Sequence, residues 1–289
     1  MRNRAAAVLA AAFVAALAAA APEAGVAETP RRVVSIHLCA DQLLLALGDR
    51  DQIAAVSWHA GDAAQSYMAG RATGLRETYG DAEDVIALHP DLVLAGAYSG
   101  RGAVALLRRL GIAVVDLALP RSFADIRAQT LAVAEALGHP ERGRALVAEM
   151  ESRLDAAAGA VSGLPPALAV LYQPGGVTMG AGFLEDEILR RAGLVNLATR
   201  LGVVGQGSVA LEALVAARPD LVVFGAEADA PPSLSTLLFD HPAIRRAAPG
   251  ARRVLLSPRL WTCGAWFTVE AVERLVAARR AVMGPRTEK

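Results

Sequence analysis

The sequence predicts an α/β protein made of two similar lobes that are joined by one long helix. Short, continuously apolar runs alternate with segments of helical period, which is typical of parallel strands covered on both faces. The stretch EDVIALHPDLVLAGA at Glu83–Ala97 nearly recurs as LEALVAARPDLVVFGA at Leu211–Ala226, 129 residues later. Between the copies, a helical period runs from Pro140 to about Val161. Twenty helical residues span roughly 30 Å, so this segment is long enough to connect two lobes.

Residues 1–27 are predicted to be a secretory signal peptide. Arg2 and Arg4 precede the apolar run Ala5–Ala21, and the small residues Gly25 and Ala27 mark a cleavage site. A membrane anchor is the alternative, but a run of 17 residues is at the short limit for a span. We therefore expect an exported chain that is cleaved after Ala27.

The first lobe is predicted over residues 28–138. Gly48 and Gly111 each stop a helix, and Pro90 ends another because the residue before proline avoids the helical region. A polar, glycine-rich segment at 59–80 is expected to be a surface loop. The expected strands are 32–36, 53–58, 92–96 and 112–117, and the expected helices are 41–47, 81–88, 101–110 and 123–137.

The connecting helix is predicted at 139–163, opened by Pro140 and closed by the Gly163–Pro166 stretch. The second lobe follows at 164–289, where the alternation restarts. Its expected strands are 167–172, 221–225 and 251–256, and its expected helices are 184–192, the start of the second repeat copy, 234–239 and 268–282.

Composition and motifs exclude several function classes. The chain has 29 basic and 29 acidic residues, and this balance argues against nucleic acid as a partner. Gly205–Ala210 matches a loose dinucleotide fingerprint, but no convincing strand precedes it, and no Gly-x-Ser-x-Gly elbow occurs. We therefore predict that the protein is not an enzyme.

The two cysteines, Cys39 and Cys263, lie 224 positions apart. Export to an oxidising compartment allows a disulfide between them. The sequence leaves two alternatives open, namely two unrelated small buried residues and a thiolate pair for a soft metal.

The order of these motifs resembles the substrate-binding proteins of bacterial ABC importers for ferric siderophores, haem and cobalamin. The resemblance covers nearly all of the mature chain. It rests on RVVSIHLCADQLLLALG, on HPDLVLAG and RPDLVVFG, and on GFLEDEILRRAGLVNLA, LLFDHPAIRRA and RLWTCGAW. It implies two Rossmann-like lobes joined by a long backbone helix, which is the class III architecture, and a monomer that delivers a small metal chelate to a permease dimer.

The resemblance also implies roles for two glutamates. In this family one glutamate on each lobe docks the importer, at the start of the repeated helix. Here those positions are Glu83 and Glu212. Carboxylates at equivalent places could pair with arginines on the two membrane subunits. The alternative is that each acid merely favours the start of its helix.

The family's ligand lies between the lobes at the ends of the strands, as expected for open α/β sheets. Flat aromatic side chains suit a large, partly apolar chelate. The ligand-binding residues predicted on this basis are Trp58, His59, Tyr98, Tyr172, Arg259 and Trp261. His37, Cys39, Asp41, Tyr67, Tyr79 and Gln173 lie at strand ends or on the long loop nearby.

The identity of the ligand stays open between a ferric siderophore, cobalamin and haem, for which Tyr98 or His59 could be the axial ligand. A direct receptor for a metal ion shares the architecture but needs three or four converging His and carboxylate ligands. Only His37 and His59 among five histidines are expected to face the cleft. We predict no metal site in the protein itself and no cofactor other than the transported chelate.

Overall fold

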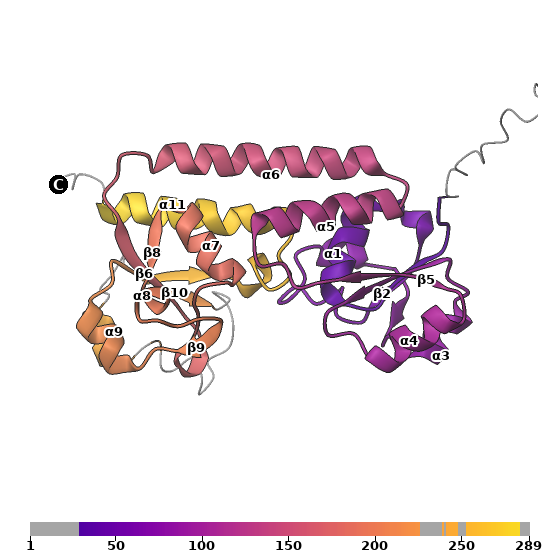
Figure 1. The fold of residues 1–289 in the computed structure, drawn as a ribbon, viewed down its shortest axis with the longest axis horizontal. Coiled ribbons are helices and arrows are strands. Elements are labelled where there is room, and N and C mark those ends of the chain that lie inside the picture. Colours follow the sequence, from indigo (N-terminus) through magenta and orange to yellow (C-terminus); the bar gives the residue numbers. More distant parts are fainter. Residues whose placement is uncertain (1–28, 226–238, 240, 248–252, 284–289) are drawn as a thin grey trace, which may run out of the picture.

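The protein has two lobes, each with its own parallel sheet (Figure 1). The computed structural model describes residues 29–225, 239, 241–247 and 253–283. The predicted signal peptide at 1–27 and, apart from Phe239, the predicted helix at 234–239 lie outside these residues. In the N-terminal lobe the strand order is β3-β2-β1-β4-β5. The bounds are β1 Val33–Ser35, β2 Ile53–Ser57, β3 Glu77–Thr78, β4 Leu92–Gly96 and β5 Ala113–Leu117.

Helices cover both faces of this sheet, which explains why its central strands β1 and β4 are almost entirely apolar. Val33, Leu92 and Leu94 pack on the side of α1 and α5, whereas Val34 and Val93 pack on the side of α3 and α4. Successive side chains of a strand point to opposite faces, so both faces require apolar residues. The helices are α1 Leu38–Leu47, α2 Ala69–Ala72, α3 Ala82–Ala87, α4 Arg101–Arg109 and α5 Phe123–Ala136.

The C-terminal lobe repeats this design with the strand order β11-β10-β6-β8. Leu221 and Val223 of β10 pack on the side of α7 and α11, and Val222 and Phe224 pack on the opposite side. A small antiparallel pair, β7 and β9, lies beside the sheet. The strands are β6 Ala167–Tyr172, β7 Val177–Met179, β8 Leu194–Asn196, β9 Gln206–Ser208, β10 Leu221–Gly225 and β11 Arg253–Leu256. The helices are α7 Leu184–Arg191, α8 Leu197–Arg200, α9 Leu211–Ala217, α10 Pro242–Ala247 and α11 Val269–Met283.

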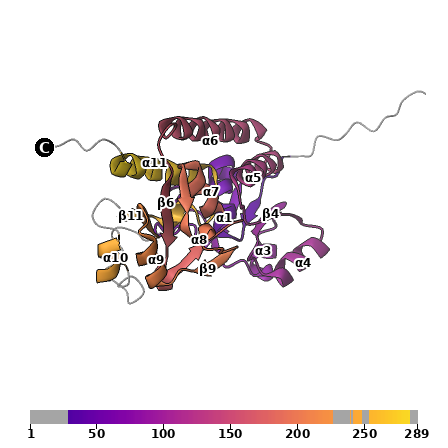
Figure 2. The ribbon, with the colours of Figure 1, turned by 60° about the vertical axis from the view of Figure 1, so that its left-hand side comes forward.

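A single long helix, α6 (Pro140–Ala160), runs across both lobes. It packs on α5 and on α11, and Figure 2 shows the same layer from another side. Val147, Met150, Leu154 and Ala157 are buried at spacings of three and four, so one stripe of the helix faces the lobes. Arg153 also donates to both carboxylate oxygens of Glu273 on α11, at 2.8 and 2.6 Å. Among the described residues, none of the helices combines the length and apolar character that crossing a membrane requires.

The sequence repeat is also a structural repeat. His89 and Arg218 stand at equivalent positions, and both adopt positive φ, at 47° and 46°. Two residues on, Asp91 accepts the backbone N–H of Arg32, and Asp220 accepts the backbone N–H of Leu168. Each aspartate thereby ties the start of its own strand to the neighbouring strand, β1 or β6. The Pro-Asp element is thus the same structural joint in each lobe.

Some short elements differ from the prediction. The segment at 59–80, expected to be a loop, contains α2 and the edge strand β3. Helix α1 begins at Leu38, three residues earlier than predicted, because the side chain of His37 caps it. The strands β7, β8 and β9 have three residues each and were not predicted.

Candidate functional site

A cavity lies at the carboxyl ends of the N-terminal lobe's strands, where the C-terminal lobe meets them. Its volume is about 390 Å³. Residues that follow β1, β2, β4 and β5 form most of the wall, and Thr262, Cys263 and Gly264 contribute from the C-terminal lobe. This is the position at which open α/β sheets bind ligands.

Aromatic side chains line one side of this cavity. Trp58 is half exposed, and its ring lies 3.6 Å from that of His59 and 6.0 Å from that of Tyr79, measured between centroids. Tyr98 lies on the same cavity and is 77% exposed. The Nδ1 atom of His59 is buried and has no hydrogen-bond partner in the described structure. The wall therefore offers flat apolar faces together with the exposed, polar-tipped side chain of Tyr98.

His37 lines the cavity and caps α1 with its ring. Its Nδ1 accepts the backbone N–H of Cys39 at 3.2 Å, so in the neutral ring the proton resides on Nε2. Burial lowers the pKa of His37, and the nearby His59 lowers it further. The ring fits because residue 96 is glycine, since a Cβ there would lie 2.3 Å from Nδ1.

A buried carboxyl group lies directly behind this wall. Asp41 in the first turn of α1 is fully buried and accepts hydrogen bonds from the backbone N–H and the hydroxyl of Ser57. Burial raises the pKa of Asp41 to about 7, and the hydrogen bonds from Ser35 and Ser57 offset only part of that effect. The group links α1 to the end of β2 and so fixes the backbone from which Trp58 and His59 extend.

Cys39 and Cys263 form a disulfide in this structure, and their Cα atoms lie 4.8 Å apart. Cys39 belongs to the first turn of α1, and Cys263 belongs to a loop of the C-terminal lobe. Both residues line the cavity. The bond therefore joins the two lobes at the cavity itself.

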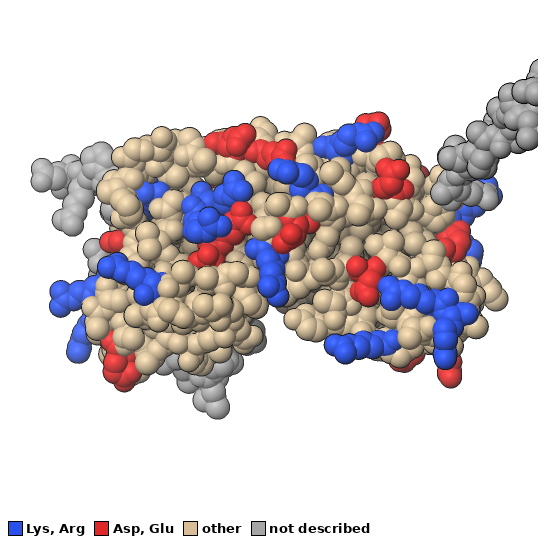
Figure 3. All heavy atoms as spheres, viewed as in Figure 1, with Lys and Arg blue, Asp and Glu red and all other residues tan. Residues whose placement is uncertain are grey.

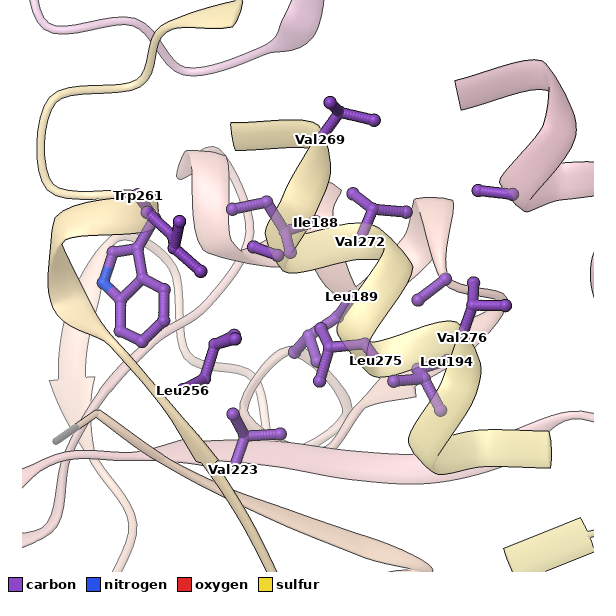
Figure 4. Close-up of a cluster of buried hydrophobic side chains, with 14 of the residues drawn as sticks. Ile188, Leu189, Leu194, Val223, Leu256, Trp261, Val269, Val272, Leu275 and Val276 are labelled. Carbon is purple, nitrogen blue, oxygen red and sulfur yellow. The ribbon is translucent and has the colours of Figure 1, made fainter. Parts of the chain in front are cut away.

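Three predicted ligand-binding residues do not line the cavity. Tyr172 and Trp261 are only 1% and 5% exposed. Tyr172 packs with Phe224 in one core of the C-terminal lobe, and Trp261 packs with Leu256 and Ile188 in the other (Figure 4). A large aromatic side chain next to a sheet gains more from burial than from exposure at the rim. Arg259 instead donates to the carbonyl oxygen of Ala63 at 3.2 Å, across the seam between the lobes.

The two predicted docking glutamates are exposed in the first turns of their helices. Glu83 lies on α3 and Glu212 on α9. Neither forms an ion pair with the described residues. Figure 1 shows α3 and α9 on the side of the molecule opposite α6, one on each lobe.

The structure adds Leu119 and Gln129 to the cavity lining, and neither was predicted from the sequence. His37, which was expected to face the cleft, and Tyr79, which was expected nearby, also line the cavity. The pairing of a histidine after β1 with a glycine at the end of the adjacent strand β4 is a further sequence signal for His37. Within the described parts of the chain, no three His, Cys, Asp or Glu side chains come together as metal ligands. Acidic and basic groups are interspersed on the face seen in Figure 3.

Sequence comparisons place most of the chain in one family. Residues 33–243 match the family model described as "Periplasmic binding protein". A "Cobalamin-binding protein" of Halobacterium salinarum is 30% identical over 203 residues, which cover 69% of this chain and 55% of that protein. The chain thus spans about half the length of the curated relatives it matches.

Solved structures share the fold. The periplasmic heme-binding protein RhuT from Roseiflexus sp. RS-1 has a TM-score of 0.70 at 23% identity, covering 88% of this chain and 99% of that one. The periplasmic vitamin B12 binding protein BtuF of Vibrio cholerae has a TM-score of 0.69 at 18% identity, covering 89% and 99%. A periplasmic heme binding protein from Pseudomonas aeruginosa has a TM-score of 0.69 at 24% identity, covering 88% and 93%. At these identities the likeness concerns the fold alone. Together with the family match over residues 33–243, it shows that the chain belongs to the periplasmic binding protein family.

Proposed function

We propose that this protein is the substrate-binding component of an ABC importer and captures a metal chelate of the cobalamin type between its lobes. The observation that carries the proposal is the aromatic cavity at the strand ends, where Trp58, Tyr79 and Tyr98 present flat faces beside His37 and His59. A corrinoid or porphyrin offers large apolar faces and a polar rim, which such a wall complements. The relative named for cobalamin supports the cobalamin class.

In this proposal the ligand is cargo, and the protein performs no catalysis. Export requires residues 1–27 as a cleaved signal peptide. The working units are then the lobes 28–138 and 164–289, linked by 139–163, acting as a periplasmic monomer. The proposed cargo is a chelate rather than a bare ion, so the proposal assigns no metal site to the protein itself.

Delivery to the permease would use the two exposed glutamates. Glu83 and Glu212 occupy matched positions on the two lobes, on the side away from α6. Each carboxylate is free to form a bidentate pair with an arginine of one membrane subunit. Two such pairs would set the register of the receptor on a permease dimer.

Haem is the second candidate, favoured by one specific observation. Tyr98 lies on the cavity with 77% of its surface exposed, and His59 lines the same cavity. Either side chain can ligate a haem iron. His37 is less suited to this role, because its Nδ1 is occupied by Cys39 and its Nε2 carries the proton.

The test is to purify the mature chain from its native host and record the absorption spectrum and mass of any bound compound. Calorimetry then measures the affinity of the ligand-free protein for cyanocobalamin and for haemin. The proposal expects tight binding of cyanocobalamin with one molecule per chain. Tight binding of haemin alone would support the second candidate, and binding of neither compound would contradict both.

A further inference from the structure

We infer that the Cys39–Cys263 disulfide is a covalent strap that holds the C-terminal wall of the cavity on the N-terminal lobe. The inference concerns the same site as the proposed function, but its structural part requires no ligand. Cys263 is 5% exposed and lies in the loop that supplies Thr262, Cys263 and Gly264 to the cavity. Among the described lining residues, these three are the only ones from the C-terminal lobe. The position of this loop therefore decides whether the cavity has its second wall.

The disulfide lies in a seam of noncovalent contacts between the lobes. The ring of Tyr67 stacks on that of Phe267 at 4.1 Å, and the Tyr67 hydroxyl donates to the carboxylate of Glu270. Burial, followed by the bond to Glu270, raises the pKa of Tyr67 to about 12, so the hydroxyl remains a donor at neutral pH. Arg259 adds its bond to Ala63. The long loop of the N-terminal lobe is thus held along the start of α11.

The loop also approaches the N-terminal lobe closely at Gly264. This residue has a φ of +54°, and a Cβ there would lie 2.5 Å from Cγ of Pro120. Only glycine allows both the backbone conformation and this distance. The backbone next to Cys263 is therefore fitted to the segment that follows β5.

The bond sets a limit on how far the cleft can open at this point. The Cα atoms of disulfide-bonded cysteines are usually no more than about 6.8 Å apart. They are 4.8 Å apart here, so the wall can move away by only about 2 Å while the bond is intact. The helix α6 connects the lobes on one side, and the disulfide connects them at the cavity. We therefore expect ligand to exchange past Trp58, Tyr79 and Tyr98, with the lobes still joined.

The experiment compares the oxidised mature protein with the same protein in TCEP and with Cys39→Ser, Cys263→Ser and the double variant. Alkylation and mass spectrometry count the free thiols, and hydrogen exchange measures the protection of 259–268. We expect no free thiol in the oxidised protein. Hydrogen exchange in 259–268 should become faster by about tenfold or more after reduction. Either single substitution and the double substitution should accelerate it to the same extent. The matched control is the double variant, which TCEP should leave unchanged.

Equal effects of the variants on hydrogen exchange would distinguish a disulfide bond from two buried cysteine side chains that act independently. Breaking one bond from either end gives the same loss, so the double substitution adds nothing, whereas two independent buried residues give additive effects. Two free thiols in the oxidised protein, additive effects of the two substitutions, or unchanged protection of 259–268 after reduction would each overturn the inference. Because reduction acts on the unmutated chain, a variant that fails to fold does not prevent the test.

A ligand arm uses cyanocobalamin as the probe. If the wall occupies its place only about one-tenth of the time after reduction, the apparent Kd rises about tenfold, mainly through faster dissociation. An unchanged Kd in protein with confirmed free thiols would overturn the role of the strap in binding. If cyanocobalamin binds neither form, the proposed ligand class fails, and the exchange experiment still decides whether the strap holds the wall.

Discussion

Replacing Trp58 by alanine should weaken ligand binding without unfolding the protein. Trp58 is 49% exposed, so about half of its surface is available for a ligand to cover. A tryptophan side chain buries up to about 200 Å², which leaves roughly 100 Å² for the ligand. At about 25 cal/mol per Å² this contact contributes at most about 2.5 kcal/mol. The remaining half packs on its neighbours, including His59, and its loss should cost a smaller part of the stability.

The expected change is a 5- to 70-fold rise in the Kd for cyanocobalamin, corresponding to about 1–2.5 kcal/mol. Calorimetry on the ligand-free mature protein measures it. Trp58→Phe is the conservative control and should retain most of the affinity, because it keeps a flat ring. Phe224→Leu is the buried control, which should lower the melting temperature while the folded fraction binds normally, since Phe224 lies in a core of the C-terminal lobe and does not line the cavity. An unchanged affinity in Trp58→Ala would refute the placement of the ligand on this wall.

Three further changes test other parts of the account. For Asp41, the folded state holds its proton up to about pH 7, whereas the unfolded state releases it near pH 4. The free energy of unfolding should therefore fall as pH rises through this window, by at most about 4 kcal/mol. Chemical denaturation of Asp41→Asn should show no such dependence on pH. An equal pH dependence in both proteins would contradict the raised pKa of Asp41. Gly96→Ala should displace the His37 ring, remove the cap of α1 at a cost of about 1 kcal/mol, and weaken binding. The control is Gly102→Ala, where nothing lies within 4 Å of the added carbon, and it should be neutral or slightly stabilising in thermal unfolding. Equal melting temperatures for the two variants would contradict the close packing of His37 on Gly96. The double variant Glu83→Ala/Glu212→Ala should abolish uptake in cells and leave the Kd for the ligand unchanged. The control Asp84→Ala, on the same helix turn as Glu83, should transport normally. Normal uptake by the double variant would contradict the docking proposal.

Most of the fold followed from local patterns in the sequence. The central strands β1, β4, β6 and β10 are almost entirely apolar because helices cover both faces of each sheet, and this pattern does not depend on distant residues. The Pro-Asp joint recurs because each lobe needs the same turn and the same carboxylate to tie neighbouring strands. In contrast, the two-residue strand β3 and the three-residue strands β7, β8 and β9 are too short to show a period. They depend on contacts with neighbouring segments, which a local pattern does not contain.

The site was only partly predictable for a related reason. Trp58, His59 and Tyr98 line the cavity because they directly follow strands of the N-terminal sheet, and the ends of parallel strands meet at one edge. Tyr172 and Trp261 also lie at the end of a strand or soon after one, yet they are buried, since the direction of each side chain depends on the packing around it. The sequence allowed a bond between Cys39 and Cys263, but only the arrangement of the lobes brings them within reach.

The most direct test is a structure of the mature protein in complex with cyanocobalamin, determined by crystallography. We predict density for one corrin ring against Trp58 and Tyr98, enclosed on the other side by residues 262–264, with the Cys39–Cys263 bond intact. A corrin bound elsewhere on the molecule, or an aromatic wall left uncovered in crystals that contain the ligand, would contradict it.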